Sequence, residues 1–458
     1  ARTVVSQRPD GSWGCAAPPA WNIDPNAPSA DVVTDTAFCT LFLSAGRHPV
    51  LMNKLRHPGA WDARPRDVAN ATRHAARAAG RPLSWRVATL DRAGADWLDA
   101  PVLYVATDQA IPFADADVAG LRRYVECGGL LFVHCDGGSG TANRFAADLA
   151  AKLFPRYPLQ KLPADHPLYA AAPGLRPEAV PLKAVSNGSR VLVLVSTDDV
   201  AANWQAGAQV GAPEPRQLAA NLHAYVAGGT VLRPRLQGYD VPAPKAAPVA
   251  TIAVARLKWA GNWDPEPGAW ARAGRFMQWE TGATVDARPT AAADLKPGAA
   301  PVAHLTGTGP LKLSDADAAA VRAYVEAGGV LLVDACGGDP VFARSAEAAL
   351  VAAMPGLALS DADRSQAPFA AAFDVMDDLT GPPGVRAPGA AKVGGAGGVP
   401  RVRVGRLGGG AVVFSPLDLS TGMAGSNALG VIGFTPDYAV GLAKNVVVWA
   451  AARRQPTP

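Results

Sequence analysis

The chain contains two copies of one sequence pattern. Residues 113–129 align with residues 313–329 without a gap, and a Gly-Gly pair closes each block. An apolar run follows directly, Leu130–Cys135 in the first copy and Val330–Ala335 in the second. Other blocks recur in the same order, including Trp61-Asp62 and Trp263-Asp264. A duplication of this kind predicts one domain architecture built twice in tandem.

The copies define the domain boundaries. Of the 458 residues 49% are hydrophobic, which is enough for more than one core. A Pro-rich stretch, Val241–Pro248, predicts an extended linker between the copies. We predict a helical segment over 1–48, repeat one over 49–232, a linker over 233–249 and repeat two over 250–458. Because the sequence starts at Ala1 and not at Met, we interpret it as a piece of a longer protein.

Each repeat alternates between strand and helix patterns. Val118, Leu121 and Val125 recur at helical spacing between two short apolar runs. Ser314 followed by Asp317 predicts a capped helix start in the second copy. The Gly-Gly pairs predict helix ends, since glycine accepts a left-handed backbone. Continuous apolar strands joined by helices predict an α/β fold, a doubly wound parallel sheet of the flavodoxin-like type in each repeat.

The N-terminal segment has its own motif. Gln7, Gly11 and Trp13 fit the pattern Q-x-x-x-G-x-W, and the apolar stretch Asp35–Leu43 predicts a helix. These residues resemble the QW motif of terpene-cyclase and prenyltransferase-type α/α toroids, where the motif is structural. The acidic D-x-D-D motif of squalene-hopene cyclases is absent, and only one QW copy is present. The resemblance implies the tail of a toroid; a surface turn with a buried tryptophan is the alternative.

The two repeats resemble a bacterial family of domains of unknown function, numbered 4159. The resemblance rests on residues 113–138, 164–169 and 196–204, and repeat two is more divergent. It implies a fold similar to class I glutamine amidotransferases and ThuA-like domains, and it brings no established activity. Proteins that combine such repeats with a toroid are often exported, so the resemblance also implies a periplasmic or extracellular location.

Polar residues at the predicted strand ends are the candidate ligand-binding residues. Ligands of doubly wound sheets bind at the carboxyl ends of the strands. This rule selects the following residues: Thr107, Asp108, Asp136, Asp199, Thr306, Asp334 and Asp418.

Cys135 is the candidate nucleophile. In amidotransferase-like folds a G-x-C-x-G elbow follows the strand, and here the matching residues are Val133-His-Cys-Asp-Gly137. Val133 replaces the first glycine and would crowd the turn. A reactive thiolate needs a base, for which His134 and His166 are the candidates. Repeat two has Ala335 at the matched position, so this chemistry could occur only in repeat one.

A metal site is a further alternative. His134, Asp136 and Asp199 combine an imidazole with two carboxylates, and Asp334 with Asp418 would be the counterpart in repeat two. The ligand types change between the repeats, and a single aspartate at a strand end more often caps a helix. We therefore assign no metal ligand and predict no cofactor.

The two copies agree where the fold needs them and differ where chemistry would take place. We therefore predict a non-catalytic binding or assembly module that binds a protein partner, itself or a glycan. A hydrolase or amidotransferase-like enzyme with one site in repeat one, and a metal-binding module, are the alternatives. The net charge of +4 is mild and no basic run occurs, so we predict no nucleic-acid binding. No apolar run is long enough to cross a bilayer.

Overall fold

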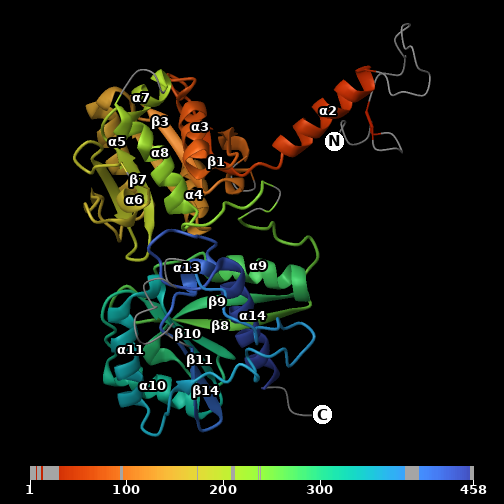
Figure 1. The fold of residues 1–458 in the computed structure, drawn as a ribbon. Coiled ribbons are helices and arrows are strands. Elements are labelled where there is room, and N and C mark those ends of the chain that lie inside the picture. Colours follow the sequence, from red (N-terminus) through yellow and green to blue (C-terminus); the bar gives the residue numbers. More distant parts are fainter. Residues whose placement is uncertain are drawn as a thin grey trace.

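The computed structural model describes residues 7, 12–13, 30–92, 96–172, 174–207, 212–235, 237, 239–386 and 402–453. Within these ranges the chain forms two stacked α/β units, and helix α2 (Ala30–Ala45) projects away from the first unit (Figure 1). Most of the predicted toroid-like segment, including Gly11 of its motif, lies outside the described residues. Trp13 is buried, and its backbone N–H donates to Thr36 Oγ1. None of the helices in the described ranges is long and apolar enough to cross a membrane.

Repeat one is built on a seven-stranded sheet in the order β2-β1-β3-β4-β7-β6-β5. The strands from β2 to β7 are parallel, while β6 and β5 extend the sheet antiparallel at one edge. Its elements are β1 (Val50–Arg56), α3 (Asp67–Ala79), β2 (Ser84–Thr89), β3 (Val102–Thr107), α4 (Asp115–Glu126), β4 (Leu130–Cys135), α5 (Gly140–Leu153), β5 (Gln160–Lys161), α6 (Pro167–Ala170), β6 (Leu182–Ser186), β7 (Val191–Ser196), α7 (Val200–Ala206) and α8 (Pro213–Val226).

Repeat two has the same topology. Its sheet, β12-β13-β14-β11-β10-β8-β9, reads as the first sheet in reverse, with the matching pair of antiparallel edge strands. Its elements are β8 (Ala250–Lys258), α9 (Ala269–Thr281), β9 (Ala283–Ala291), β10 (Val302–Gly307), α10 (Asp315–Glu326), β11 (Val330–Ala335), α11 (Pro340–Ala353), β12 (Ser360–Asp361), β13 (Arg403–Leu407), β14 (Gly410–Ser415), α13 (Ser420–Met423) and α14 (Pro436–Ala452).

The predicted doubly wound α/β class is confirmed. The parallel strands of repeat one follow the flavodoxin-like order 2-1-3-4-5. In repeat one, helices α3, α7 and α8 cover one face of the sheet and α4 and α5 the other, so two apolar cores form. The sequence pattern did not indicate the two antiparallel edge strands, because β5 has only two exposed residues and therefore no apolar run.

The helix ends follow the predicted local rules. The Ser314 hydroxyl accepts from the Asp317 backbone N–H, and the Asp317 carboxylate accepts from the Ser314 N–H, which makes the expected capping box. Gly128 has a φ of 92°, a left-handed conformation that favours glycine. The next glycine, Gly129, makes room for a ring, since a Cβ there would lie 2.4 Å from Tyr124 Cε1. Repeat two has the same arrangement.

The two repeats pack head to tail. The carboxyl edge of the second sheet faces the amino edge of the first, where the turn between β6 and β7 carries Asn187 and Arg190. We call residues 187–190 the hook. Asn187 Nδ2 donates to Glu266 Oε1 (2.9 Å), and Ser189 Oγ lies 2.6 Å from Thr421 Oγ1. The carboxyl edge of repeat one lies at the opposite end of its own sheet, away from this interface.

The segment that joins the repeats lies on helix α9. Arg272 Nε donates to the Tyr239 carbonyl oxygen (2.7 Å), and Arg275 forms an ion pair with Asp240 (2.6 Å). Trp279 Nε1 donates to the Pro242 carbonyl oxygen (2.7 Å). We call residues 239–242 the strap; one face of α9 holds it over about two helical turns.

Candidate functional site

The carboxyl edge of repeat one brings together residues that are far apart in sequence. In the sheet register Ala106 lies beside His134, and His134 lies beside Ser196. Asp136 follows β4 by one residue, and Asp199 begins α7, where its carboxylate accepts from the Ala202 N–H. The parallel arrangement of β4 and β7 therefore places His134, Asp136 and Asp199 at one point.

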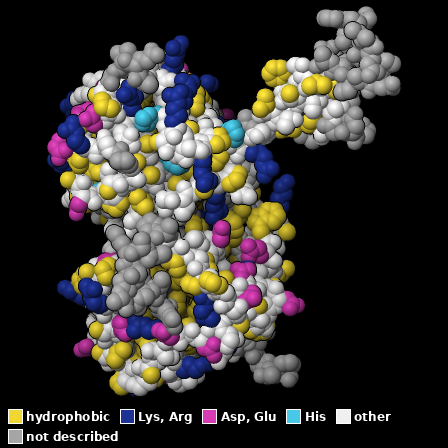
Figure 2. Space-filling model, in the orientation of Figure 1, with side chains coloured by type: hydrophobic (Ala, Val, Ile, Leu, Met, Phe, Trp, Pro, Cys, Tyr) yellow, Lys and Arg dark blue, Asp and Glu magenta, His cyan; other side chains and the backbone are white. Residues whose placement is uncertain are grey.

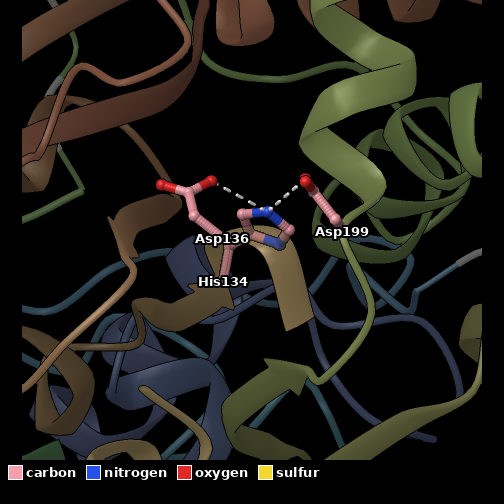
Figure 3. Close-up of side chains that lie close together, drawn as sticks. All are labelled: His134, Asp136 and Asp199. Atoms are coloured by element: carbon pink, nitrogen blue, oxygen red, sulfur yellow. Dashed lines mark ion pairs between the residues drawn. The ribbon is translucent and has the colours of Figure 1, made fainter. Parts of the chain in front are cut away.

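These three side chains form a compact group of donor atoms. His134 Nε2 lies 3.2 Å from Asp136 Oδ1 and 3.4 Å from Asp199 Oδ1, and both carboxylates point towards the ring (Figure 3). His134 is fully buried, and Asp136 is nearly so. Among the described residues, neither ring nitrogen of His134 and neither carboxylate oxygen of Asp136 has a partner in hydrogen-bond geometry. Buried polar atoms are rarely left in this state.

The electrostatics of the group favour a positive charge at its centre. Burial alone would lower the pKa of His134, but the Asp136 and Asp199 carboxylates outweigh it and hold the pKa above its usual value. Burial would raise the pKa of Asp199, yet His134 and Arg64 outweigh it and hold that pKa well below its usual range. Asp199 is therefore ionised at neutral pH.

Arg64 and Tyr104 complete the surroundings. Arg64 lies in the loop after β1, and its guanidinium binds the Asp199 carboxylate through two nitrogens, with Nε 3.2 Å from Oδ1. Its Nε is 3.9 Å from Asp136 Oδ1. The Tyr104 ring stacks on His134 with ring centres 6.1 Å apart. Arg64 therefore fixes the orientation of Asp199, and Tyr104 fixes the plane of the imidazole.

The other candidates of β3 lie at the margin of the site. The Thr107 hydroxyl donates to the Gln109 carbonyl oxygen (2.7 Å) and accepts from its N–H, so it shapes the loop. Asp108 is exposed. His57 is buried beside them and contacts the Ala106 carbonyl oxygen at 2.9 Å. Thr107 thus has a structural role, while Asp108 is free to meet solvent.

Cys135 points to the other side of the sheet. Its side chain is fully buried in the core under α4 and α5, whereas His134 faces α3 and α7. Burial, aided by the charge of Asp136, raises the pKa of the Cys135 thiol to about 11. A thiol in this position is neither ionised at neutral pH nor accessible to a substrate. Its geometry disfavours the predicted nucleophile.

His166 does not lie near Cys135 or His134. It precedes the short helix α6, where its Nδ1 accepts from the Leu168 N–H. Its ring contacts Tyr225, whose hydroxyl accepts from the Val191 N–H at the start of β7. Val191 belongs to the amino edge of the sheet, whereas Cys135 ends β4 at the carboxyl edge. The structure therefore separates His166 from the site it was expected to serve.

The matched site in repeat two is filled by the protein itself. Asp334 stands at the position of His134 and accepts from His304 Nε2 (2.7 Å) and from the backbone N–H groups of Leu419 and Ser420 (3.0 Å each). The Thr306 hydroxyl lies 3.3 Å from Ser420 Oγ. Burial would raise the pKa of Asp334, but His304 and the backbone donors outweigh it and hold the pKa below its usual value.

Asp418, the counterpart of Asp199, is satisfied in the same way. Its carboxylate accepts from the N–H groups of Gly337 (2.8 Å) and Thr421 (3.0 Å), and lies 3.5 Å from an Arg386 nitrogen. The hook covers this edge: a Cβ on Gly337 would lie 3.0 Å from Ser189 Oγ, whereas a Cβ on Gly137 would meet no atom within 4 Å. Asp334 and Asp418 therefore hold the loops of repeat two together, and among the described residues the hook covers the edge of repeat two but has no counterpart at Gly137 of repeat one.

The sequence pattern pointed to His134, Asp136 and Asp199 but not to Arg64. Arg64 lies close in sequence to Arg66 and Arg73, and the three arginines together indicate a solvated loop and helix surface. The available signal was its place after β1, because the strand-end rule applies to that strand as well. Tyr104 gave no signal, since within a buried strand it is one apolar residue among others.

These features define a tandem α/β protein in which one of two equivalent strand edges carries a His-Asp-Asp group and the other is covered by the hook. Residues 52–226 and 252–451 match the family described as Domain of unknown function (DUF4159). The chain therefore belongs to this family and carries the domain over two segments, consistent with tandem copies. No curated protein matches the chain.

Proposed function

We propose that the protein is a binding module whose first repeat holds one divalent transition-metal ion at its carboxyl edge, while the second repeat serves as a fixed platform. The observation that carries the proposal is that the buried ring nitrogens of His134 and carboxylate oxygens of Asp136 have no hydrogen-bond partner among the described residues. His134, Asp136 and Asp199 each offer one ligand atom, and these atoms all lie within 4.8 Å of one another.

The donor spacing suits a single ion. Two donors that each lie about 2.1 Å from one metal are roughly 3.0 Å apart at a right angle and roughly 3.4 Å apart at a tetrahedral angle. The measured separations from His134 Nε2 are 3.2 Å to Asp136 and 3.4 Å to Asp199. An ion can therefore enter with only small movements of the side chains.

The ligand types select the kind of metal. One imidazole nitrogen and two carboxylate oxygens suit Zn²⁺, Mn²⁺ or Fe²⁺ better than Ca²⁺, which prefers oxygen alone, or Cu⁺, which prefers sulfur. Arg64 supports Asp199 from behind, as residues next to metal ligands commonly do. A proton on His134 occupies the same nitrogen, so metal and proton compete for the site.

The comparison with repeat two limits the proposal to repeat one. There Asp334 and Asp418 use their oxygens for backbone N–H groups, and Cys336 replaces Asp136. The Cys336 thiol is fully buried, and burial raises its pKa well above the usual value. Since these donors are already engaged or protonated, we expect one ion per chain.

The test is a titration of the chelator-treated full chain with Zn²⁺ and Mn²⁺ by isothermal calorimetry, checked by elemental analysis. We expect one site, and at least tenfold weaker binding in His134→Asn and in Asp136→Asn. Asp198→Asn is the matched control, because Asp198 is exposed next to the group and does not belong to it. Thermal melts establish that each variant is folded. Absence of binding, or equal binding by all three variants, would rule the proposal out.

A further inference from the structure

A second candidate site lies on repeat one, between helix α3 and helices α7 and α8. A cavity of about 60 Å³ opens there, and its charged lining comes from Arg73, Arg77 and Arg216, with His74 beside them. Arg73 and Arg77 are exposed and one helical turn apart. Basic side chains gather over this part of repeat one in Figure 2, with a histidine next to them. The site is independent of the His-Asp-Asp group.

Within the described ranges, no acidic side chain neutralises the positive charges of this cavity. None of the three arginines forms an ion pair with an acidic residue in the part of the chain that the structure describes. Arg216 donates to the Gly207 carbonyl oxygen (3.0 Å), and Arg73 to Asn70 Oδ1 (3.4 Å), which are neutral acceptors. The guanidinium groups therefore keep donors available for an anion.

Repeat two contains the same groove in a filled form. Helices α3 and α9 match at an offset of 202, so Asn70 corresponds to Arg272. Asn70 Nδ2 donates to the Trp204 carbonyl oxygen, and Arg272 Nη1 donates to the matching carbonyl oxygen of Met423, both at 2.9 Å. These equivalent bonds show that the two grooves have the same construction.

The strap fills the groove of repeat two. Arg275, which matches Arg73, binds the carboxylate of Asp240, and Trp279, which matches Arg77, donates to the carbonyl oxygen of Pro242. The strap is thus an extended segment with one carboxylate. Arg275 and Trp279, one helical turn apart on α9, contact it at Asp240 and Pro242. In repeat one the corresponding stretch of chain belongs to α2, which projects away from the domain (Figure 1).

We propose that the α3 groove of repeat one binds an extended acidic segment of a partner protein, in the manner in which α9 binds the strap. Arg77 replaces Trp279, so repeat one has a guanidinium group at both of these matched positions, whereas repeat two has one only at Arg275. Arginine binds carboxylates through paired N–H donors. The cavity of about 60 Å³ has room for a carboxylate head group.

The test uses a fluorescein-labelled peptide, Tyr-Asp-Val-Asp-Ala-Pro, which copies residues 239–244 with Pro242→Asp to meet Arg77. Fluorescence anisotropy measures its binding to the full chain at low ionic strength, where surface charges are least screened. The reference is the same peptide with both aspartates replaced by asparagine. We expect the aspartate peptide to bind at least fivefold more tightly.

The double variant Arg73→Gln/Arg77→Gln is expected to abolish this preference. Arg144→Gln is the matched control: Arg144 is exposed on α5, which covers the opposite face of the sheet, and it is expected to leave binding unchanged. Both mutated arginines are exposed, and a thermal melt establishes that the variants are folded. Equal binding of the two peptides, or an unchanged preference in the double variant, would overturn the proposal. Inorganic phosphate that competes at a lower concentration than the peptide would also overturn it.

Discussion

Arg190 of repeat one and Glu266 of repeat two form a buried ion pair across the boundary between the repeats. Arg190 Nε lies 2.7 Å from Glu266 Oε1, Nη2 lies 3.0 Å from Oε2, and each side chain is 1% exposed. The remaining guanidinium donors bind the carbonyl oxygens of Gly129 and Val125. Arg190 therefore connects the hook both to the amino edge of its own sheet and to the second repeat.

Removing the negative charge of this pair should destabilise the whole chain. Glu266→Gln leaves the Arg190 charge buried without compensation, and we expect the free energy of unfolding to fall by about 3–5 kcal/mol. Urea denaturation followed by circular dichroism measures the change. Asp115→Asn is the control: Asp115 pairs with Lys152 at the exposed surface, where solvent screens the pair, so we expect no comparable loss of stability. A loss of under 1 kcal/mol in Glu266→Gln would contradict this interpretation of the interface.

The glycines after the fourth strand of each sheet should respond differently to alanine. Gly137 and Gly337 both have a left-handed φ, 63° and 72°, so alanine costs about 1 kcal/mol at either position. Only at Gly337 does a new Cβ also meet the hook, at 3.0 Å from Ser189, and overpacking adds about 1–2 kcal/mol. The midpoints of urea denaturation of Gly137→Ala and Gly337→Ala, both measured without metal, test whether the second variant loses more stability. Equal losses would mean that the hook does not close the edge of repeat two.

Cys135 should be unreactive in the folded protein. Because its pKa is about 11 and its side chain is fully buried, alkylation by iodoacetamide near neutral pH should be at least 100-fold slower than that of Cys39, which is partly exposed on α2. Mass spectrometry of tryptic peptides locates the modified cysteines. If Cys135 is labelled as fast as Cys39, the hypothesis of a nucleophile in repeat one gains strong support.

His166 should make folding sensitive to mild acid. Burial lowers its pKa in the folded chain to about 4, compared with about 6.5 when unfolded, so the unfolded state binds the proton first as the pH falls. The proton bound by His166 in the unfolded state therefore lowers the free energy of unfolding as the pH falls from about 6.5 to about 4. At higher pH His166 is neutral in both states and has no such effect. His166→Asn keeps a side chain that can accept from Leu168, and should lose about 2 kcal/mol less than the wild type between about pH 7 and pH 4. Urea denaturation at both pH values measures the loss of stability. An equal loss in the variant and the wild type would refute the prediction.

Interactions between residues close in sequence were enough to predict the α/β fold. They were enough to predict only part of the candidate site. The Gly-Gly pairs, Ser314 and the apolar strands act through their immediate neighbours, and the structure has them as expected. His134, Asp136 and Asp199 were named because strand ends of a parallel sheet converge. Arg64 and the hook could not be found in this way, since each depends on a tertiary contact: Arg64 on the position of Asp199, and Arg190 on a glutamate 76 residues away.

The same loop position has opposite charges in the two repeats. At the offset of 202 that relates α3 to α9, Arg64 corresponds to Glu266. Arg64 holds Asp199 at the open edge, whereas Glu266 reaches the hook of the neighbouring repeat. At this one loop position, Arg64 therefore shapes a site, whereas Glu266 joins two domains. The periodicity of the sequence does not distinguish these two roles.

The turn between β13 and β14 is shorter than its counterpart in repeat one. Where repeat one has the four-residue hook, repeat two has only Gly408 and Gly409, and the N–H of Gly409 bonds to Glu326 of its own repeat. Among the described residues, the amino edge of repeat two therefore carries no counterpart of the hook. The contact between the repeats therefore has a direction: the hook of repeat one inserts into the carboxyl edge of repeat two, and the described turn of repeat two has no equivalent hook.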